Sequence, residues 1–494
     1  MGEQKNIPSR RGNFISGIWQ EGSGPVFTSY DPVTRDVIWE GHSSSSTDIR
    51  EAIEASLSAG EGWRKVPLQE RISILNRFGD LVRAHRAELG RLISLEIGKP
   101  TWEALTEVDS VAGKIAPTLE AYQSRIRENR REASGATSVT RFKPYGVVAV
   151  IGPFNFPAHM PNGHIMPALL SGNTVIFKPS EFSPAVAEMI VSLWHEAGLP
   201  KGVLNLVQGG AEVGRRLVES PTVDGIYFTG SLKAGLAISK TLADSPWRIA
   251  ALEMGGNSPL VVWDYRDIKF ALYTVLYSAF VTTGQRCSAA RRLIIKSGNA
   301  DFIEALKRST ERLRVGHFTL DPEPFMGPMV RREHAISLLE TQRRLLNNGA
   351  SPIVQARLID EISALIKPGI VDVTSMNHRE DEEILGPFLQ VIHVKTFEEA
   401  ILEANRTKYG LAAGLISQDE RKFRDFFSST RAGIVNWNQP LPGASPFAPF
   451  GGVKASGNNR PSGFFAVDYC SYPIASLESP LGNLPPKIPP GLEL

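Results

Sequence analysis

The fold of this chain is decided by the stretch GVVAVIGP (146–153) and by its counterpart GIYFTG (225–230). Each is a short apolar run that ends in Gly or Pro, which is typical of a buried parallel strand. Three further runs have the same texture: NTVIFKP (173–179), GVLNLVQG (202–209) and SPLVVW (258–263). Helical segments lie between them, such as SPAVAEMIVSLWHEAG (183–198) and EVGRRLVESP (212–221). Because strands and helices alternate, the sequence predicts a doubly wound α/β sheet.

Outside this series the chain shows three other sequence patterns. The residues before it are mostly helical, with Thr47 and Asp48 suited to a helix N-terminus and a longer amphipathic helix after Pro67. A second α/β series predicts a second domain and comprises RRLIIK (291–296), DFIEALKRSTERLRV (301–315), KPGIVDV (367–373) and FLQVIHV (388–394). Two stretches alternate polar and apolar residues as half-exposed strands do, and they could pair with each other or with another subunit: GATSVTRFKPYG (135–146) and FFAVDYCSYPIASLE (464–478).

The composition excludes several classes of protein. The 494 residues are 42% hydrophobic and 21% charged, which is ordinary for a soluble globular protein of two or three domains. A formal net charge of +2 gives no electrostatic case for nucleic acid or an anionic membrane as partner. The first residues contain no apolar signal region, no apolar run approaches the ~18 residues of a membrane span, and two cysteines cannot build a disulfide framework. We therefore expect a cytoplasmic protein that acts on a small molecule and holds no metal.

Two features suggest a nucleotide site at the carboxyl ends of the strands. In FTGSLKAG (228–235) a strand runs into Gly230 and a helix opens by Gly235, so that free backbone N–H groups could bind a phosphate, although such turns are also common without a ligand. In VIFKPSE (175–181) another strand ends at Lys178, and Glu181 follows. The lysine can donate to ribose hydroxyls, and the carboxylate accepts from them and repels a 2′-phosphate, which favours NAD over NADP. The alternative is a surface charge pair at a strand end.

Three residues are candidates for the chemical step, and each has a structural alternative. Asn155 lies on a rigid loop, IGPFNFPAHMPNGH (151–164), where its amide could stabilise an oxyanion or cap its own turn. Glu253 leaves an apolar strand before a double glycine, and it could be a general base or a carboxylate bonded to backbone amides. Cys287, in TTGQRCSAARR (282–292), could be a reactive thiolate or a small buried hydrophobe. Cys470 lies in an alternating stretch, and we interpret it as a structural residue.

The order and spacing of these residues resemble the NAD(P)-dependent aldehyde dehydrogenase superfamily. The matching positions are Asn155, Lys178, the GSLKAG turn (230–235), Glu253 and Cys287. The later stretches EEILGPF (382–388) and PFGGVKASG (449–457) resemble two more motifs of that family. The resemblance covers nearly the whole chain, from about Ile15 to Leu477.

This resemblance implies an aldehyde dehydrogenase-like α/β fold with a doubly wound cofactor domain, an α/β catalytic domain and a bridging β arm. The implied boundaries are 1–125 and 145–254 for the NAD-binding domain, 255–455 for the catalytic domain, and 126–144 with 463–484 for the arm. Because the family's arm makes dimers, the resemblance implies a homodimer or a dimer of dimers.

The resemblance also implies roles for individual residues. Cys287 attacks the aldehyde, the Asn155 amide and the Cys287 backbone N–H stabilise the oxyanion, and Glu253 activates the water that releases the acid. NAD is the implied cofactor, and Glu383 would bind its nicotinamide ribose. The other implied cofactor residues are Phe154, Lys178, Glu181, Gly230, Ser231, Leu232, Lys233, Ala234 and Gly235.

Four stretches resemble one subfamily of this family more closely: 152–181, 282–293, 436–445 and 456–478. The substrate of that subfamily is a semialdehyde with two carboxylates. Such a substrate needs cations or several donors, and Arg286, Arg460 and His164 are candidates. Each could instead be structural, and for Arg286 we favour that interpretation. The rival functions are an aldehyde dehydrogenase for another acidic or amino-acid-derived semialdehyde, a CoA-acylating enzyme in which Glu253 has no clear use, and a non-catalytic protein that keeps the fold.

Overall fold

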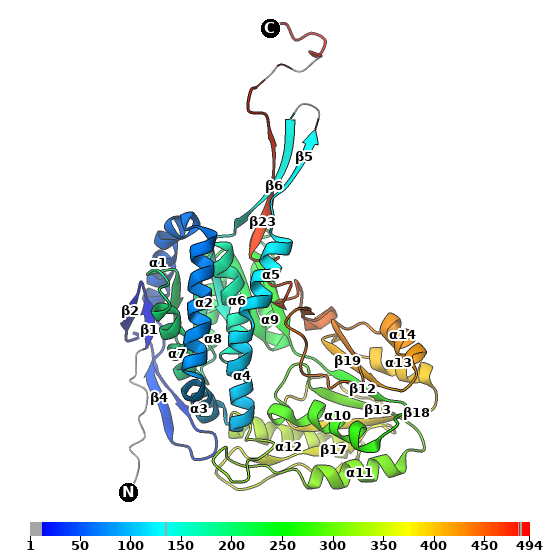
Figure 1. The fold of residues 1–494 in the computed structure, drawn as a ribbon. Helices are drawn as coiled ribbons and strands as arrows, with labels where there is room; N and C mark the ends of the chain where they lie inside the picture. The colour runs from blue at the N-terminus through cyan, green and yellow to red at the C-terminus, as the bar shows by residue number, and fades with distance from the viewer. Residues whose placement is uncertain (1–11, 134–135, 483, 485–486) are drawn as a thin grey trace.

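A computed structural model describes residues 12–133, 136–482, 484 and 487–494. Two separate seven-stranded sheets form the two halves of the molecule, and a narrow three-stranded arm projects from the first half (Figure 1). This architecture confirms the predicted α/β fold. Short two-stranded pairs complete it: β3 (Val26–Tyr30) with β4 (Val37–His42), β15 (Arg357–Leu358) with β16 (Ile366–Lys367), and β21 (Pro449–Phe450) with β22 (Ser462–Gly463).

The first sheet has the strand order β11-β10-β7-β8-β9-β1-β2. Its strands are β1 (Asn13–Ile15), β2 (Ile18–Gln20), β7 (Val147–Ile151), β8 (Thr174–Lys178), β9 (Leu204–Leu206), β10 (Gly225–Gly230) and β11 (Ile249–Met254). Neighbours from β11 to β9 are parallel, and β1 and β2 add an antiparallel edge. β7 and β8 are buried along their whole length, which is why they are apolar throughout rather than alternating. Four of the five predicted strands lie in this sheet. The fifth, at 258–263, is the first strand along the chain that belongs to the other sheet.

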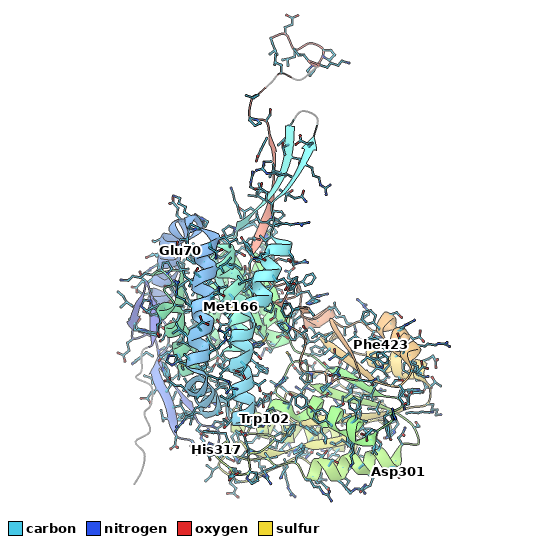
Figure 2. The ribbon with its side chains drawn as sticks, in the orientation of Figure 1. Glu70, Trp102, Met166, Asp301, His317 and Phe423 are labelled. Atoms are coloured by element: carbon cyan, nitrogen blue, oxygen red, sulfur yellow. The ribbon has the colours of Figure 1, made fainter. Side chains whose placement is uncertain are left out.

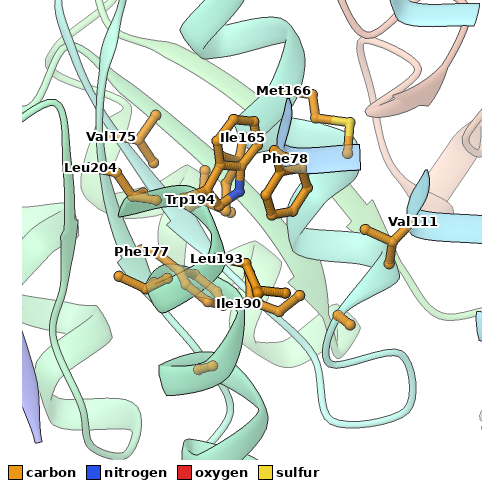
Figure 3. Packing of buried hydrophobic residues seen from close by; sticks show 14 of the residues in the cluster. Phe78, Val111, Ile165, Met166, Val175, Phe177, Ile190, Leu193, Trp194 and Leu204 are labelled. Carbon is orange, nitrogen blue, oxygen red and sulfur yellow. The ribbon is translucent and has the colours of Figure 1, made fainter. Parts of the chain in front are cut away.

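The helices of the first half surround this sheet (Figure 1). They are α1 (Ser46–Lys65), α2 (Leu68–Ala84), α3 (Arg86–Ile97), α4 (Thr101–Gly113), α5 (Ile115–Arg125), α6 (His159–Ser171), α7 (Pro184–Glu196), α8 (Ala211–Glu219) and α9 (Leu232–Leu242). α1 begins beside the predicted start, because Ser45 and Asp48 form a capping box. In the core between α2 and α7, the Phe78 and Trp194 rings stack with centroids 3.8 Å apart (Figure 3).

The second sheet has the order β14-β17-β18-β13-β12-β19-β20, parallel except for β14. Its strands are β12 (Ser258–Val262), β13 (Ala290–Lys296), β14 (Ser351–Val354), β17 (Gly369–Asp372), β18 (Phe388–Val394), β19 (Ala412–Ile416) and β20 (Ile434–Trp437). Its helices are α10 (Ile268–Phe280), α11 (Ala300–Glu311), α12 (Arg332–Asn347), α13 (Phe397–Asn405) and α14 (Glu420–Ser429), with short 3₁₀ helices η1 (Val281–Gly284) and η2 (Lys454–Ser456). None of the helices in the described ranges is both long and apolar enough to cross a membrane.

The start of α4 joins the two halves. The Trp102 backbone N–H donates to Glu323 at 2.8 Å, and its indole N–H donates to the Pro324 carbonyl at 3.2 Å. Nearby, His317 Nε2 lies 3.0 Å from Asp31 Oδ2. Figure 2 labels Trp102 and His317 where the two halves meet. The two contacts of Trp102 fix the start of α4 against the second half, and the Asp31 contact adds a second link between the halves.

The arm consists of β5 (Asn129–Ala133), β6 (Ala136–Pro144) and β23 (Ser471–Glu478), in the order β23-β6-β5. The two predicted half-exposed strands therefore pair with each other. The second is shorter than predicted, because residues 464–470 form turns in which Tyr469 and Cys470 are buried: the Cys470 thiol donates to the Ala466 carbonyl and the Tyr469 hydroxyl to the Pro461 carbonyl. The domain boundaries stay a prediction, and residues 1–11, 134–135 and 483 of those ranges lie outside the described residues.

Candidate active site

Cys287 lies on a strained loop between α10 and β13. In this loop Thr282 and Thr283 have φ angles of 57° and 55°. Left-handed backbone is unfavourable for β-branched residues, so it persists only where the surroundings hold it. The Thr283 hydroxyl donates to the Gly327 carbonyl at 2.9 Å, and the Gln285 carboxamide is bonded to backbone groups of the same neighbouring segment. The loop therefore presents Cys287 on a fixed backbone.

A buried ion pair supports the same loop from α4. The Glu103 carboxylate accepts hydrogen bonds from the Thr282 hydroxyl and from the Arg286 guanidinium, the latter at 3.0 Å. Arg286 also donates to the Thr282 hydroxyl at 2.6 Å and lies 4.7 Å from the centroid of the Phe156 ring. The charge of Arg286 is therefore engaged within the protein.

Glu253, at the end of β11, faces Cys287. Its side chain is 1% exposed, and its carboxyl lies close enough to the Cys287 thiol for each group to shift the pKa of the other. Burial, and then the nearby Glu383 carboxylate, raise the pKa of Glu253 to about 8. Burial and the charge of Glu253 also raise the pKa of the Cys287 thiol. A carboxyl group that titrates near neutral pH beside a thiol can exchange protons with it and with water.

Asn155 approaches the same loop from the end of β7. Its Nδ2 donates to the Gln285 carbonyl at 2.7 Å, two residues before Cys287. Its second amide hydrogen remains for a ligand. The loop that carries Asn155 is anchored by Glu107 of α4, which accepts two backbone N–H groups at the start of α6, at 2.9 and 3.1 Å. The three predicted catalytic side chains thus converge on one loop.

The predicted cofactor residues lie at the carboxyl ends of the first sheet's strands. β8 ends at Lys178, which is buried and has its Nζ 3.8 Å from Glu181 Oε2. β10 runs into Gly230, and Ser231 caps α9 by accepting the Ala234 N–H at 3.3 Å. The first turn of α9 also contains Leu232, Lys233 and Gly235. The buried Lys178 ammonium, whose ion pair with Glu181 is long, can donate to the hydroxyls of a dinucleotide. The N–H groups at the start of α9 can bind its phosphates.

The two remaining predicted cofactor residues come from loops. Glu383 precedes β18 and is half-buried, desolvation raises its pKa, and its Oε1 accepts the Gly256 N–H at 3.3 Å. Its charge also raises the pKa of Glu253, so it lies close to that carboxyl. Phe154, next to Asn155, packs edge-on against Phe182 with ring centroids 6.0 Å apart.

A cavity of about 310 Å³ opens onto Cys287 and Asn155. Of the three predicted substrate residues, only Arg286 lines it. His164 is buried beneath Tyr469, with its Nδ1 2.8 Å from the phenol oxygen, and Arg460 donates to the Gly452 carbonyl at 2.8 Å. The structure does not bring His164 and Arg460 to this cavity, because both are engaged by the segment around residues 452–469.

Sequence reasoning missed the polar face that lines the cavity from α4 to the start of α5. It consists of Glu103, Thr106, Glu107, Ser110 and Lys114. These positions recur every three or four residues, which places them on one side of the helical segment. This polar periodicity was the signal available in the sequence.

Within the described ranges, no group of three or more His, Cys, Asp and Glu side chains could hold a metal ion.

The chain belongs to the aldehyde dehydrogenase family, whose sequence pattern matches residues 19–473, and it is an oxidoreductase. It is similar to the N-succinylglutamate 5-semialdehyde dehydrogenase of Pseudomonas fluorescens (strain Pf0-1), with 48% identity over 97% of this chain and 99% of that protein. It is also similar to the enzyme of the same name from Ectopseudomonas mendocina (strain ymp), with 47% identity over 98% of this chain and 99% of that protein. Among solved structures it is similar to an E. coli enzyme described as NADP dependent, with 29% identity, a TM-score of 0.90 and coverage of 95% of this chain and 98% of that one. These likenesses confirm the family resemblance and the fold.

Proposed function

We propose that this enzyme oxidises N-succinylglutamate 5-semialdehyde to N-succinylglutamate, a step of arginine catabolism, with NAD as the oxidant. The observation that supports this substrate is the 48% identity, over 97% of the chain, to a protein named N-succinylglutamate 5-semialdehyde dehydrogenase. The chemistry of the cavity agrees with it. Cationic side chains line the space beside Cys287, and an aldehyde with two carboxylates needs such groups.

In this proposal Cys287 is the nucleophile. Glu253 takes the proton of the neighbouring Cys287 thiol, and the sulfur attacks the aldehyde carbon. The carbonyl oxygen becomes an oxyanion, to which the Asn155 amide and the Cys287 backbone N–H donate. Oxidation at this carbon leaves a thioester on Cys287. The Asn155 amide is held ready for this role because its other N–H is fixed to the loop.

NAD would be held by the residues at the strand ends. The buried Lys178 and the half-exposed Glu181 would bind the adenosine ribose, the first turn of α9 the pyrophosphate, and Glu383 the nicotinamide ribose. When bound, NAD accepts the hydride that leaves the aldehyde carbon. Phe154 would pack beside the cofactor. The Glu181 carboxylate would repel a 2′-phosphate, which supports NAD rather than NADP.

Glu253 acts a second time when the thioester is hydrolysed. After it has released the thiol proton to solvent, its carboxylate takes a proton from the water that attacks the thioester carbon. The carbon–sulfur bond then breaks, the carboxylic acid leaves, and Glu253 returns the proton to the Cys287 sulfur. A pKa of about 8 makes the group able both to take and to return a proton near neutral pH.

We also propose that the enzyme is a cytoplasmic homodimer or dimer of dimers joined through the arm. The support is the shape of the arm, which projects from the first half beside α5 and α6 and has β5 and β23 as its outer strands (Figure 1). An outer strand offers free backbone groups to a neighbouring chain.

The test is NADH formation by purified protein with NAD and four aldehydes: the semialdehydes of N-succinylglutamate, glutamate and succinate, and an uncharged aliphatic aldehyde. We expect a clear preference for the N-succinylglutamate compound, and no turnover by a Cys287→Ser variant. Comparable rates on all four would contradict the substrate and favour a dehydrogenase for other semialdehydes. Turnover only in the presence of CoA would favour the acylating alternative, and no NADH under any condition would favour a non-catalytic protein.

A further inference from the structure

The cavity beside Cys287 contains a buried cation with no carboxylate partner among the described residues. Lys114 lies at the junction of α4 and α5, is 7% exposed, and donates from Nζ to the Ser462 hydroxyl at 3.2 Å. We propose that Lys114 binds a carboxylate of the substrate and so selects acidic aldehydes. This inference rests on the proposed function and names the group that recognises its substrate.

The other basic side chains around the cavity are already neutralised. Lys99 Nζ lies 2.6 Å from Glu107 Oε2, and Arg286 lies 3.0 Å from Glu103. Both oxygens of Glu107 are engaged, because Oε1 accepts the two backbone N–H groups at the start of α6. Of these three cations, Lys114 is the one with charge left for a ligand.

The surroundings of Lys114 make an anion the favourable ligand. Burial lowers the pKa of Lys114 to about 7, even though the charge of Glu107 acts in the opposite direction. A buried ammonium that has lost its water needs a hydrogen-bonded anion to recover that solvation. His159 also lines the cavity, and burial and the Lys114 charge lower its pKa, so it stays neutral and leaves the positive charge to Lys114.

The backbone of α6 is shaped around this ammonium. Gly163 lies against it, and a Cβ at this position would collide with Lys114 Nζ and come within 3.0 Å of Ser462 Oγ. α4, α5 and α6 lie side by side (Figure 1), so this glycine makes the space in which the lysine ends. The Ser462 hydroxyl accepts from Lys114 and therefore has its own hydrogen to donate to the same carboxylate. Lys114 and Ser462 together form a two-donor site.

The test compares kcat and KM of the wild type and Lys114→Met on the N-succinylglutamate semialdehyde and on an uncharged aliphatic aldehyde. For the acidic aldehyde we expect kcat/KM to fall about 10- to 100-fold, the range of one charged hydrogen bond. The loss should lie mainly in KM, because the carboxylate is bound equally before and during the reaction. The uncharged aldehyde should keep its kcat/KM. The matched control is Lys269→Met, an exposed lysine on α10, which should change neither substrate.

Lys114→Met should remain folded, because methionine keeps much of the side-chain length and removes a buried charge, and thermal unfolding checks this. If it does not fold, Ser462→Ala decides, with an expected loss of about 3- to 10-fold on the acidic aldehyde alone. Equal losses on both aldehydes would mean a structural role and overturn the inference. If the wild type prefers the acidic aldehyde and Lys114→Met keeps both that preference and the KM, the inference is overturned and the proposed function stands. A wild type with no preference for carboxylates would overturn both.

Discussion

Replacing Glu253 with Gln tests the second half of the proposed reaction. The pKa of this carboxyl is raised to about 8, chiefly by burial. About one tenth of it is therefore ionised at pH 7 and about nine tenths at pH 9. Only the carboxylate can take a proton from water, so we expect the wild-type hydrolysis of the thioester to accelerate about tenfold between these pH values.

In Glu253→Gln the hydrolysis should slow by about 10²- to 10⁴-fold, which corresponds to about 3–5 kcal/mol in the barrier. Attack by Cys287 should slow far less than hydrolysis, because removing the Glu253 charge lowers the raised pKa of the thiol and so offsets the loss of the base that takes its proton. Rapid mixing of the variant with NAD and aldehyde should therefore give about one NADH per active site at once, and then almost none. The variant should also lose the rise in rate through pH 8.

The stability of the variant provides the control. Because the folded-state pKa of Glu253 lies above its ordinary value of 4.5, the wild type loses stability as pH rises from about 4.5 to about 8. Gln cannot ionise, so the Tm of the variant relative to the wild type should increase over this range and level off above it. A folded variant that turns over within about threefold of the wild type, or keeps the rise through pH 8, would refute the assignment of Glu253 as the base.

Three other substitutions test separate parts of the structure. Gly255→Ala would push a methyl group into the Glu383 carboxylate, and we expect a higher KM for NAD in steady-state kinetics; an unchanged KM would argue against Glu383 as a cofactor residue. Glu107→Gln removes the charge that pairs with a buried lysine and weakens the anchor of the loop after β7, so kcat should fall alike on acidic and uncharged aldehydes. A loss confined to acidic aldehydes would contradict that role. Phe78→Ala empties the ring position stacked on Trp194 and should lower the free energy of unfolding by about 3–5 kcal/mol in urea denaturation, whereas a loss under about 1 kcal/mol would show that the core closes around the gap.

Elements whose signal lies within a few consecutive residues could be predicted from the sequence. The runs at 146–153 and 225–230 are apolar because β7 and β10 are buried in the middle of a parallel sheet, and no other part of the chain is needed to read them. The alternation at 464–478 predicts one strand, but only its second part, from Ser471, is a strand in the structure. The earlier residues alternate for another reason: Tyr469 and Cys470 turn inward to bond to carbonyls several residues back.

The candidate site divides in the same way. The positions of Asn155, Glu253 and Cys287 follow from motifs, so their convergence could be expected. The state of the charges around them could not, because it depends on partners far away in the chain. From the sequence Arg286 could bind substrate or be structural, and we favour the structural interpretation without being able to name its partner; in the structure its guanidinium pairs with Glu103, 183 positions earlier. A basic residue next to a candidate catalytic cysteine is therefore a weak guide to substrate binding.

The same reasoning explains why Lys114 is visible only in the structure. A site that selects anions must leave one buried cation without a partner, and the sequence offers Lys99 and Lys114 on either side of Glu107. The carboxylate of Glu107 pairs with Lys99 because its other oxygen is held by the backbone at the start of α6. If Glu107 turned toward Lys114, the cavity would lose both its uncompensated charge and the anchor of the loop that carries Asn155. One carboxylate thus holds the loop that carries Asn155 and leaves Lys114 without a carboxylate partner among the described residues, so the two parts of the proposed site, for the oxyanion and for the substrate carboxylate, depend on the same side chain.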